Sequence, residues 1–153
     1  MRDRRFVAKH RGGPLEEEQH RLLMAWALAC ATRVLPLLEG DIDPRLRDAL
    51  RVGAAWEAGE ASVGAAQKAA VQVHAAARDA ASPVAVAVAR AVGHAVATAH
   101  MADHAIGSAM YARKALRLLG RPVEPERAWQ NASLPDAVRE LVLTSPKHAM
   151  EIG

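Results

Sequence analysis

Apolar residues recur at steps of three and four along most of the chain, the spacing that places them on one face of an α-helix. In the first run, Leu22, Trp26 and Cys30 belong to this face. Residues 133–136 look like a capping box that opens the last helix, and residues 145–146 predict its end. The whole pattern predicts helices over about residues 16–38, 44–58, 62–81, 83–100, 104–119, 124–130 and 133–145.

One stretch fits two structures. Val84, Val86 and Val88 alternate with alanines, which is the period of a β-strand, but valines also recur every four residues over a longer window. We predict a helix, because the longer pattern has the helical period. This helix either continues into the next one or breaks near residues 100–103, and ordinary helix lengths favour the break.

Alanine accounts for 35 of the 153 residues, and the only aromatic side chains besides the histidines are one Phe, one Tyr and three Trp. Alanine is the best helix former, and helices faced with it can approach one another closely. We therefore predict an all-α, single-domain bundle of about six to seven closely packed helices. Its expected parts are a basic N-terminal arm (1–14), core helices (15–119) and short C-terminal helices (120–153).

The lack of a recognisable targeting signal and the low cysteine content predict a protein inside the cell. No stretch approaches the roughly 18 uncharged apolar residues of a membrane span, and the first residues lack the apolar core of a signal peptide. The single cysteine, Cys30, leaves no internal disulfide and fits a reducing compartment. We expect a cytoplasmic protein without a membrane partner, and no motif in the sequence indicates a cofactor.

Positive charge is concentrated at the N-terminus. The chain carries a net charge of +3, and its first 14 residues hold five cations against the single acid Asp3, so the rest is nearly neutral. This arm could contact a phosphate backbone, which keeps a nucleic-acid-associated protein as an alternative function. A short charged terminus is more often a solvated tail, however, and the three tryptophans are too scattered for a base-stacking platform. Nucleic acid is therefore not the expected partner.

Three segments share the pattern His-Ala-x-small. They begin at His74, His94 and His104, and each places a histidine one turn before a small residue on the same helical face. The pattern suggests that several helices present equivalent faces to one another. The simplest interpretation is structural, with the rings wedged between alanine faces and each bonded to a carbonyl or a carboxylate.

The histidines also allow two chemical interpretations. His100 and His104 are four residues apart and could share a metal with Asp103, but the sequence has no Glu in a His-Glu-x-x-His arrangement. An acid–base or metal-dependent enzyme would need His74 and His94 to converge with these two. No phosphate-binding loop or nucleophile elbow supports an enzyme, so a non-catalytic protein is expected and no residue is assigned a catalytic role.

A set of short runs covers most of residues 2–117 and combines polar, aromatic and small residues in a fixed order. The runs are Arg2-Asp3-x-Arg5-Phe6-Val7, Arg11-Gly12-Gly13, His20-Arg21-Leu22-Leu23, Trp26-Ala27-x-x-Cys30-Ala31, Ala55-Trp56-x-x-Gly59-Glu60, His74-Ala-Ala-Ala-Arg78, Gly93-His94-Ala95, Thr98-Ala99-His100, His104-Ala105 and Tyr111-Ala112-x-Lys114-Ala115. In these runs the chain resembles the immunity proteins of the fifth immunity class and its relatives, which belong to bacterial polymorphic toxin systems. The remainder of the chain departs from the pattern.

The resemblance implies a small helical protein that binds and neutralises a cognate toxin in the cell that makes it, without catalysis. It also implies a ligand- or partner-binding site among the recurring polar and aromatic positions, which are His74, Arg78, His94, His100, His104, Trp26 and Trp56. Because the chain has a basic net charge, it would attract a basic toxin only through a local acidic patch. Residues 16–18, Glu57 and Glu60 are the candidates for such a patch. A homodimer through an alanine-lined face is a further expectation.

Overall fold

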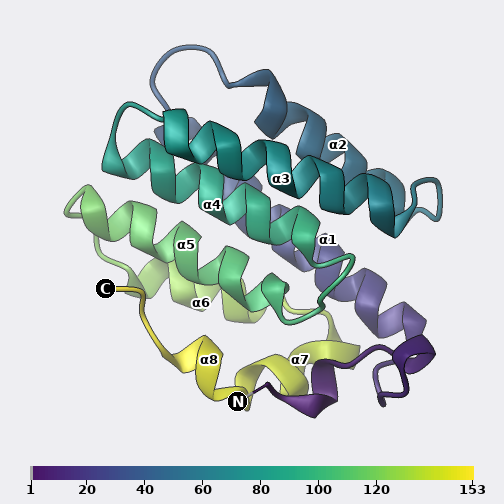
Figure 1. The fold of residues 1–153 in the computed structure, drawn as a ribbon. Helices are drawn as coiled ribbons and strands as arrows, with labels where there is room; N and C mark the ends of the chain where they lie inside the picture. Colours follow the sequence, from purple (N-terminus) through teal and green to yellow (C-terminus); the bar gives the residue numbers. More distant parts are fainter. Residues whose placement is uncertain (1) are drawn as a thin grey trace.

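The computed structural model describes residues 2–153, which form eight α-helices and three single 3₁₀ turns (Figure 1). Two of the long helices end in a glycine with positive φ, Gly59 after α2 at 79° and Gly120 after α5 at 70°. The helices are α1 (Glu17–Val34), α2 (Pro44–Glu57), α3 (Val63–Asp79), α4 (Pro83–Ala97), α5 (His104–Leu118), α6 (Glu124–Ala132), α7 (Asp136–Leu143) and α8 (Pro146–Ala149), and the 3₁₀ turns are Arg4–Phe6, Lys9–Arg11 and Leu35–Leu37.

The all-α prediction is confirmed. The valine-rich stretch is helical in α4, and the chain breaks between α4 and α5 where the length argument placed the break. Ser62 and Ser82 cap α3 and α4 by accepting hydrogen bonds from the amides of Ala65 and Ala85. The starts of these two helices could be predicted from the sequence because a short polar side chain accepts a hydrogen bond from a free amide of the first turn.

One local prediction at the C-terminal end is wrong and another is incomplete. The N-cap of α7 is Pro135, and no side chain caps this helix, so residues 133–136 do not form a capping box. Helix α7 does end just before Ser145-Pro146, but it is not the last helix, because Pro146 occupies the first turn of the additional short helix α8. Proline fits there because the first helical position needs no amide hydrogen.

The N-terminal arm is not a solvated tail. Phe6 is only 1% exposed and belongs to the core, and Leu15 is 2% exposed. The Arg5 guanidinium donates to the Thr144 hydroxyl at 2.7 Å, which ties the arm to the end of α7. The N-terminal segment accordingly lies beside α7 and α8 (Figure 1). An apolar residue among the arginines anchors the arm.

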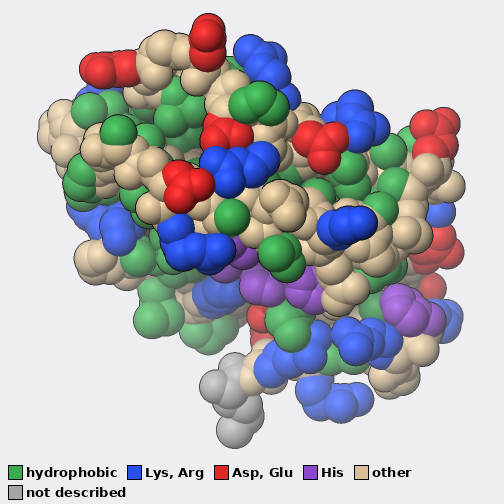
Figure 2. All heavy atoms as spheres, turned by 45° about the horizontal axis from the view of Figure 1, so that its top comes forward, with side chains coloured by type: hydrophobic (Ala, Val, Ile, Leu, Met, Phe, Trp, Pro, Cys, Tyr) green, Lys and Arg blue, Asp and Glu red, His purple; other side chains and the backbone are tan. Residues whose placement is uncertain are grey.

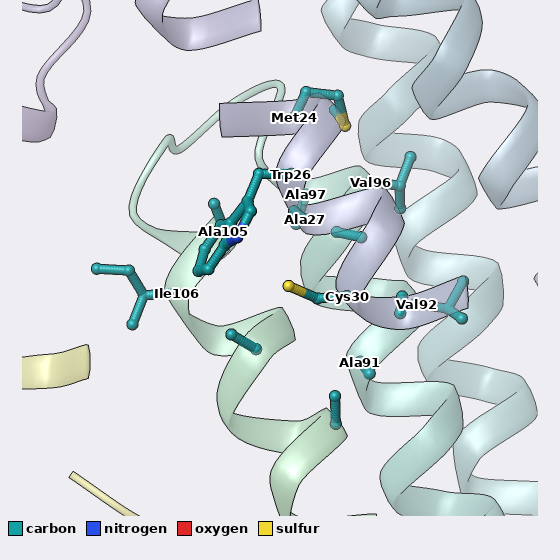
Figure 3. Close-up of a cluster of buried hydrophobic side chains, with 14 of the residues drawn as sticks. Met24, Trp26, Ala27, Cys30, Ala91, Val92, Val96, Ala97, Ala105 and Ile106 are labelled. Carbon is teal, nitrogen blue, oxygen red and sulfur yellow. The ribbon is translucent and has the colours of Figure 1, made fainter. Parts of the chain in front are cut away.

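Helix α4 lies at the centre of the bundle and contacts α1, α2, α3 and α5 (Figure 1). Its buried side chains are only alanines, valines and one glycine, which lets four neighbours approach it. Larger core side chains come from several other segments, among them α1, and Figure 3 shows Met24, Trp26 and Cys30 of α1 beside small residues of α4 and α5. Within residues 2–153, no helix is both long and apolar enough to cross a membrane.

The C-terminal segment is held by a buried arginine. Arg113 on α5 is fully buried and donates to the side chains of Gln130, at 2.7 Å, and Glu151, at 3.1 Å. It also donates to the carbonyls of His148 and Met150, each at 3.2 Å. A buried guanidinium is tolerated because its donors find acceptors. Arg113 thus ties residues 148–151 to the bundle.

Candidate functional site

Four histidines lie in one line across the bundle, and we call them the histidine row: His74 of α3, His94 of α4, His104 of α5 and His100 of the turn between α4 and α5. Neighbouring ring centroids are 6.2 Å apart for His74 and His94, 4.9 Å for His94 and His104, and 5.5 Å for His104 and His100. All four side chains are partly exposed. Figure 2 shows histidines forming a band on the surface, with Lys and Arg side chains on both sides.

Two glycines allow the rings to meet. A Cβ atom at Gly93 of α4 would lie 2.9 Å from Cε1 of His74, and one at Gly107 of α5 would lie 3.0 Å from both Cε1 and Cγ of His94. Each ring therefore occupies the space that a side chain on the next helix would fill. The His-Ala-x-small pattern found repeated segments, but the small residue that accommodates each ring belongs to the neighbouring helix.

The Nδ1 atoms of three rings are occupied by contacts within the protein. Arg90 donates to Nδ1 of His74 at 2.6 Å, and the Nδ1 atoms of His94 and His104 share a hydrogen bond at 3.0 Å. The Tyr111 ring stacks on His94 with a centroid distance of 5.1 Å. These contacts fix the orientation of the rings from the inside of the bundle.

The Nε2 atoms are in a different situation. None of the four has a hydrogen-bond partner in the described part of the chain, and none is buried, so all four reach solvent. In His100 it is Nδ1 that is buried without a partner. The row therefore offers four solvent-accessible Nε2 atoms, three of them on rings whose Nδ1 atoms are held by contacts within the protein.

Burial and neighbouring cations keep the rings neutral. Burial lowers the pKa of His94 to about 3, with His104 and Lys147 adding to the effect, and burial lowers the pKa of His104 to about 4. The pKa of His74 is lowered by burial and then by Arg90 and Arg78. That of His100 is lowered by burial and then by Arg11, against the opposing charge of Asp103. At neutral pH the row consists of uncharged imidazoles bordered by charged Arg and Lys.

A cleft of about 260 Å³ adjoins the His100 end of the row. Its lining includes Arg2, His10, Arg11 and His20 and no carboxylate. Arg11 also donates to the carbonyl of His100 at 3.3 Å. The N-terminal arm thus extends the basic border of the row.

Of the remaining predicted site residues, the two tryptophans lie away from the row and Arg78 lies beside it. Trp26 is 2% exposed in the core and donates its indole N–H to the carbonyl of Gln130 at 2.9 Å. Trp56 is half-buried and lies against His20, with ring centroids 4.8 Å apart. Arg78 is exposed near His74, as its effect on the pKa of that ring shows. Of the seven candidates, the four histidines and Arg78 come together and the two tryptophans do not.

Two further histidines fit the structural interpretation. Nε2 of His20 lies 2.6 Å from the carbonyl of Thr98, and Nε2 of His148 lies 2.7 Å from the side-chain oxygen of Asn131. Both rings are buried, with exposed fractions of 5% and 4%. In contrast to the row, these rings use Nε2 inside the protein. They are wedges in the core.

Two residues that hold the rings of the row in place, Arg90 and Tyr111, were not predicted from the sequence. Arg90 precedes His94 by four residues, and Tyr111 follows His104 by seven, so each lies on the same helical face as its histidine. That spacing was the available signal. It could not show that Arg90 bonds to His74 of a different helix.

The arrangement of the side chains gives little support to the metal and catalytic interpretations. Among residues 2–153, no group of three or more His, Cys, Asp or Glu side chains is arranged to hold a metal ion. Asp103, the weak candidate third ligand, has one buried oxygen without a partner. Asp79, the carboxylate next to Arg78 in sequence, forms an ion pair with Arg45 at 3.1 Å.

The candidate acidic patch is partly neutralised. Glu16 pairs with Lys9 at 3.0 Å, and Glu17 pairs with Arg21 at 2.6 Å. Glu18, Glu57 and Glu60 form no ion pair with residues 2–153, so the candidate acidic patch keeps part of its charge.

Comparison with known proteins identifies a family. The chain matches, over residues 13–137, the family described as Imm-5 like putative immunity protein. Comparisons with curated proteins and with solved structures gave no match. The matched range includes α1 to α6 and the whole histidine row with Arg78 and Arg90. The chain thus belongs to the family of Imm-5 like immunity proteins.

Proposed function

We propose that this protein is an immunity protein that binds a cognate toxin and neutralises it without catalysis. The observation that carries the proposal is the family match, which extends over 13–137 and includes the entire row. The geometry is consistent with a binding surface, since the four Nε2 atoms reach solvent and three of the four rings are held by contacts of their Nδ1 atoms.

The electrostatics favour binding over acid–base catalysis. A catalytic imidazole must take up a proton near the working pH, and it is commonly oriented by a carboxylate that stabilises the charged ring. Here the Nδ1 atom of His74 accepts from a guanidinium, and His94 has a pKa lowered to about 3 by burial. Such rings are poor bases at neutral pH but good neutral hydrogen-bonding groups.

Co-expression with the products of neighbouring reading frames tests the proposal. We expect one of these products to arrest growth when expressed alone, and we expect this chain to restore growth and to co-purify with it in a fixed ratio. Denaturing the complex should release the toxin with unchanged mass, since neutralisation without catalysis leaves it intact. If no neighbouring product is bound or detoxified, the proposal is wrong, and a covalently altered toxin would indicate an enzyme instead.

A further inference from the structure

The histidine row presents hydrogen-bond donors to solvent. Because Arg90 can only donate, Nδ1 of His74 must accept, and the neutral ring then carries its proton on the outward Nε2 atom. In the bond between His94 and His104, one Nδ1 donates and the other accepts, so the accepting ring also carries an outward Nε2–H. At least two donors therefore face the solvent from the row.

The cations bordering the row lack compensating carboxylates. Arg78 forms no ion pair, Arg90 donates to a neutral ring, and Arg11 donates to a backbone carbonyl, all within the described part of the chain. Elsewhere on the surface Arg21 pairs with Glu17 at 2.6 Å, whereas Arg47 and Arg121 are exposed and have no ion pair within the described residues. Asp103, whose charge acts on His100 and His104, lies 4.0 Å from Lys147. An anionic ligand would meet both donors and uncompensated positive charge.

The surroundings favour a protein carboxylate over a nucleic acid. Binding of single-stranded nucleic acid usually depends on exposed aromatic rings that stack on bases. Here Tyr111 is stacked on His94, Trp56 lies against His20, and Trp129 lies under the Arg33 guanidinium at 4.0 Å. Each of these rings already has a partner.

We infer that the histidine row and its bordering arginines form the surface that binds the toxin, and that this surface recognises carboxylate groups on an acidic face of that partner. The inference rests on the proposed function for the identity of the partner, but its chemistry can be tested separately. It also explains how a basic immunity protein reaches its target, because opposite charges accelerate association.

A peptide of about ten glutamates serves as the probe, with an oligothymidylate of similar length and inorganic phosphate as competitors. Binding is followed by NMR at the Cε1–H signals of all histidines. We expect the peptide to shift the signals of the four row histidines, to leave the buried His20 and His148 unchanged, and to lose affinity as salt is added.

Two double variants with the same net charge separate this site from general attraction. Arg11→Glu with Arg78→Glu reverses two charges beside the row, and Arg47→Glu with Arg121→Glu reverses two exposed charges without ion pairs elsewhere. All four side chains are exposed, so both variants should fold. We expect the first to weaken peptide binding at least about tenfold and the second to change it less than about threefold.

Several outcomes would overturn the inference: equal weakening in both variants, shifts outside the row, or no shift at millimolar peptide. Tighter binding of the oligothymidylate would point to nucleic acid, and equally strong binding of phosphate would point to a small-anion site. With the co-expressed toxin, the first variant should lose neutralisation and the second should keep it. If both variants retain neutralisation, the inference about the surface is wrong but the proposed function is still supported. If the peptide binds at the row but no toxin is found, the carboxylate-binding surface is supported and the proposed function is not.

Discussion

The contact between the His94 ring and Gly107 determines the sign of the effect of Gly107→Ala. Replacing glycine by alanine in a helix interior ordinarily stabilises a protein by about 0.8–1.0 kcal/mol. At Gly107 the new Cβ would lie 3.0 Å from both Cε1 and Cγ of His94 and closer still to Nδ1. The ring cannot easily move aside, because His104 holds its Nδ1 atom and Tyr111 stacks on its face.

We therefore expect the clash to exceed the gain in helix propensity. Overpacking of this kind typically costs about 1–3 kcal/mol, so Gly107→Ala should lower the free energy of unfolding by about 1 kcal/mol net. Urea denaturation followed by circular dichroism measures this change, and the melting temperature should fall by about 2–4 °C. In a His94→Ala background the same substitution should stabilise by about 1 kcal/mol, which gives a coupling energy of about 2 kcal/mol.

Gly64→Ala on α3 is the matched control. The nearest neighbour of a Cβ at Gly64 is the Ser62 hydroxyl at 3.8 Å, so alanine fits there and should be neutral or stabilising. If Gly107→Ala stabilises the natural chain as much as it stabilises the His94→Ala variant, the ring does not depend on that glycine. The close approach of α4 and α5 would then not be what holds the row in place.

Three further predictions concern buried groups. The pKa values of His94, about 3, and His104, about 4, lie below the usual value of about 6.5, so the unfolded state binds more protons in acid. The free energy of unfolding should therefore be full above about pH 6.5 and fall by more than about 1 kcal/mol by pH 5. A double Gln variant at these positions should lose less stability over this range in urea denaturation, and the remaining loss should come in part from His148, whose pKa burial lowers to about 4. Arg113→Leu should cost about 2–4 kcal/mol because it leaves buried acceptors unpaired, whereas Arg47→Leu on the surface should not change the urea midpoint. The Cys30 thiol, whose pKa burial raises, should react with a thiol reagent only after unfolding, and rapid labelling of the native chain would contradict its placement in the core.

The helices could be predicted because their signals are local. Caps such as Ser62 and Ser82 act within one turn, and the period of apolar residues follows from the geometry of a single helix. The wrong prediction at residues 133–136 also rested on a local signal. The sequence matches a capping box there, but Pro135 takes the N-cap position. The burial of Phe6 was likewise invisible, because a sequence does not show which distant surface covers an arm.

The histidine row could be predicted only in part. The repeated segments identified its members, but the line they form depends on how α3, α4 and α5 are aligned. That alignment is set by Gly93 and Gly107, which accept rings from the preceding helix. No spacing within one helix carries this information. The same limit hid the bond from Arg90 to His74, which joins residues of different helices.

The structure also changes the question that the sequence raised about these histidines, which was whether they are wedges or a site. In the row the two nitrogens of a ring face different surroundings: Nδ1 of His74 is bound inside the bundle, and its Nε2 reaches solvent. His20 shows the contrasting case, since its Nε2 is bound by the Thr98 carbonyl within the core. A structural role and a binding role can therefore reside in one ring. Loss of stability after removing a row histidine would not by itself argue against a role for its outer nitrogen in binding.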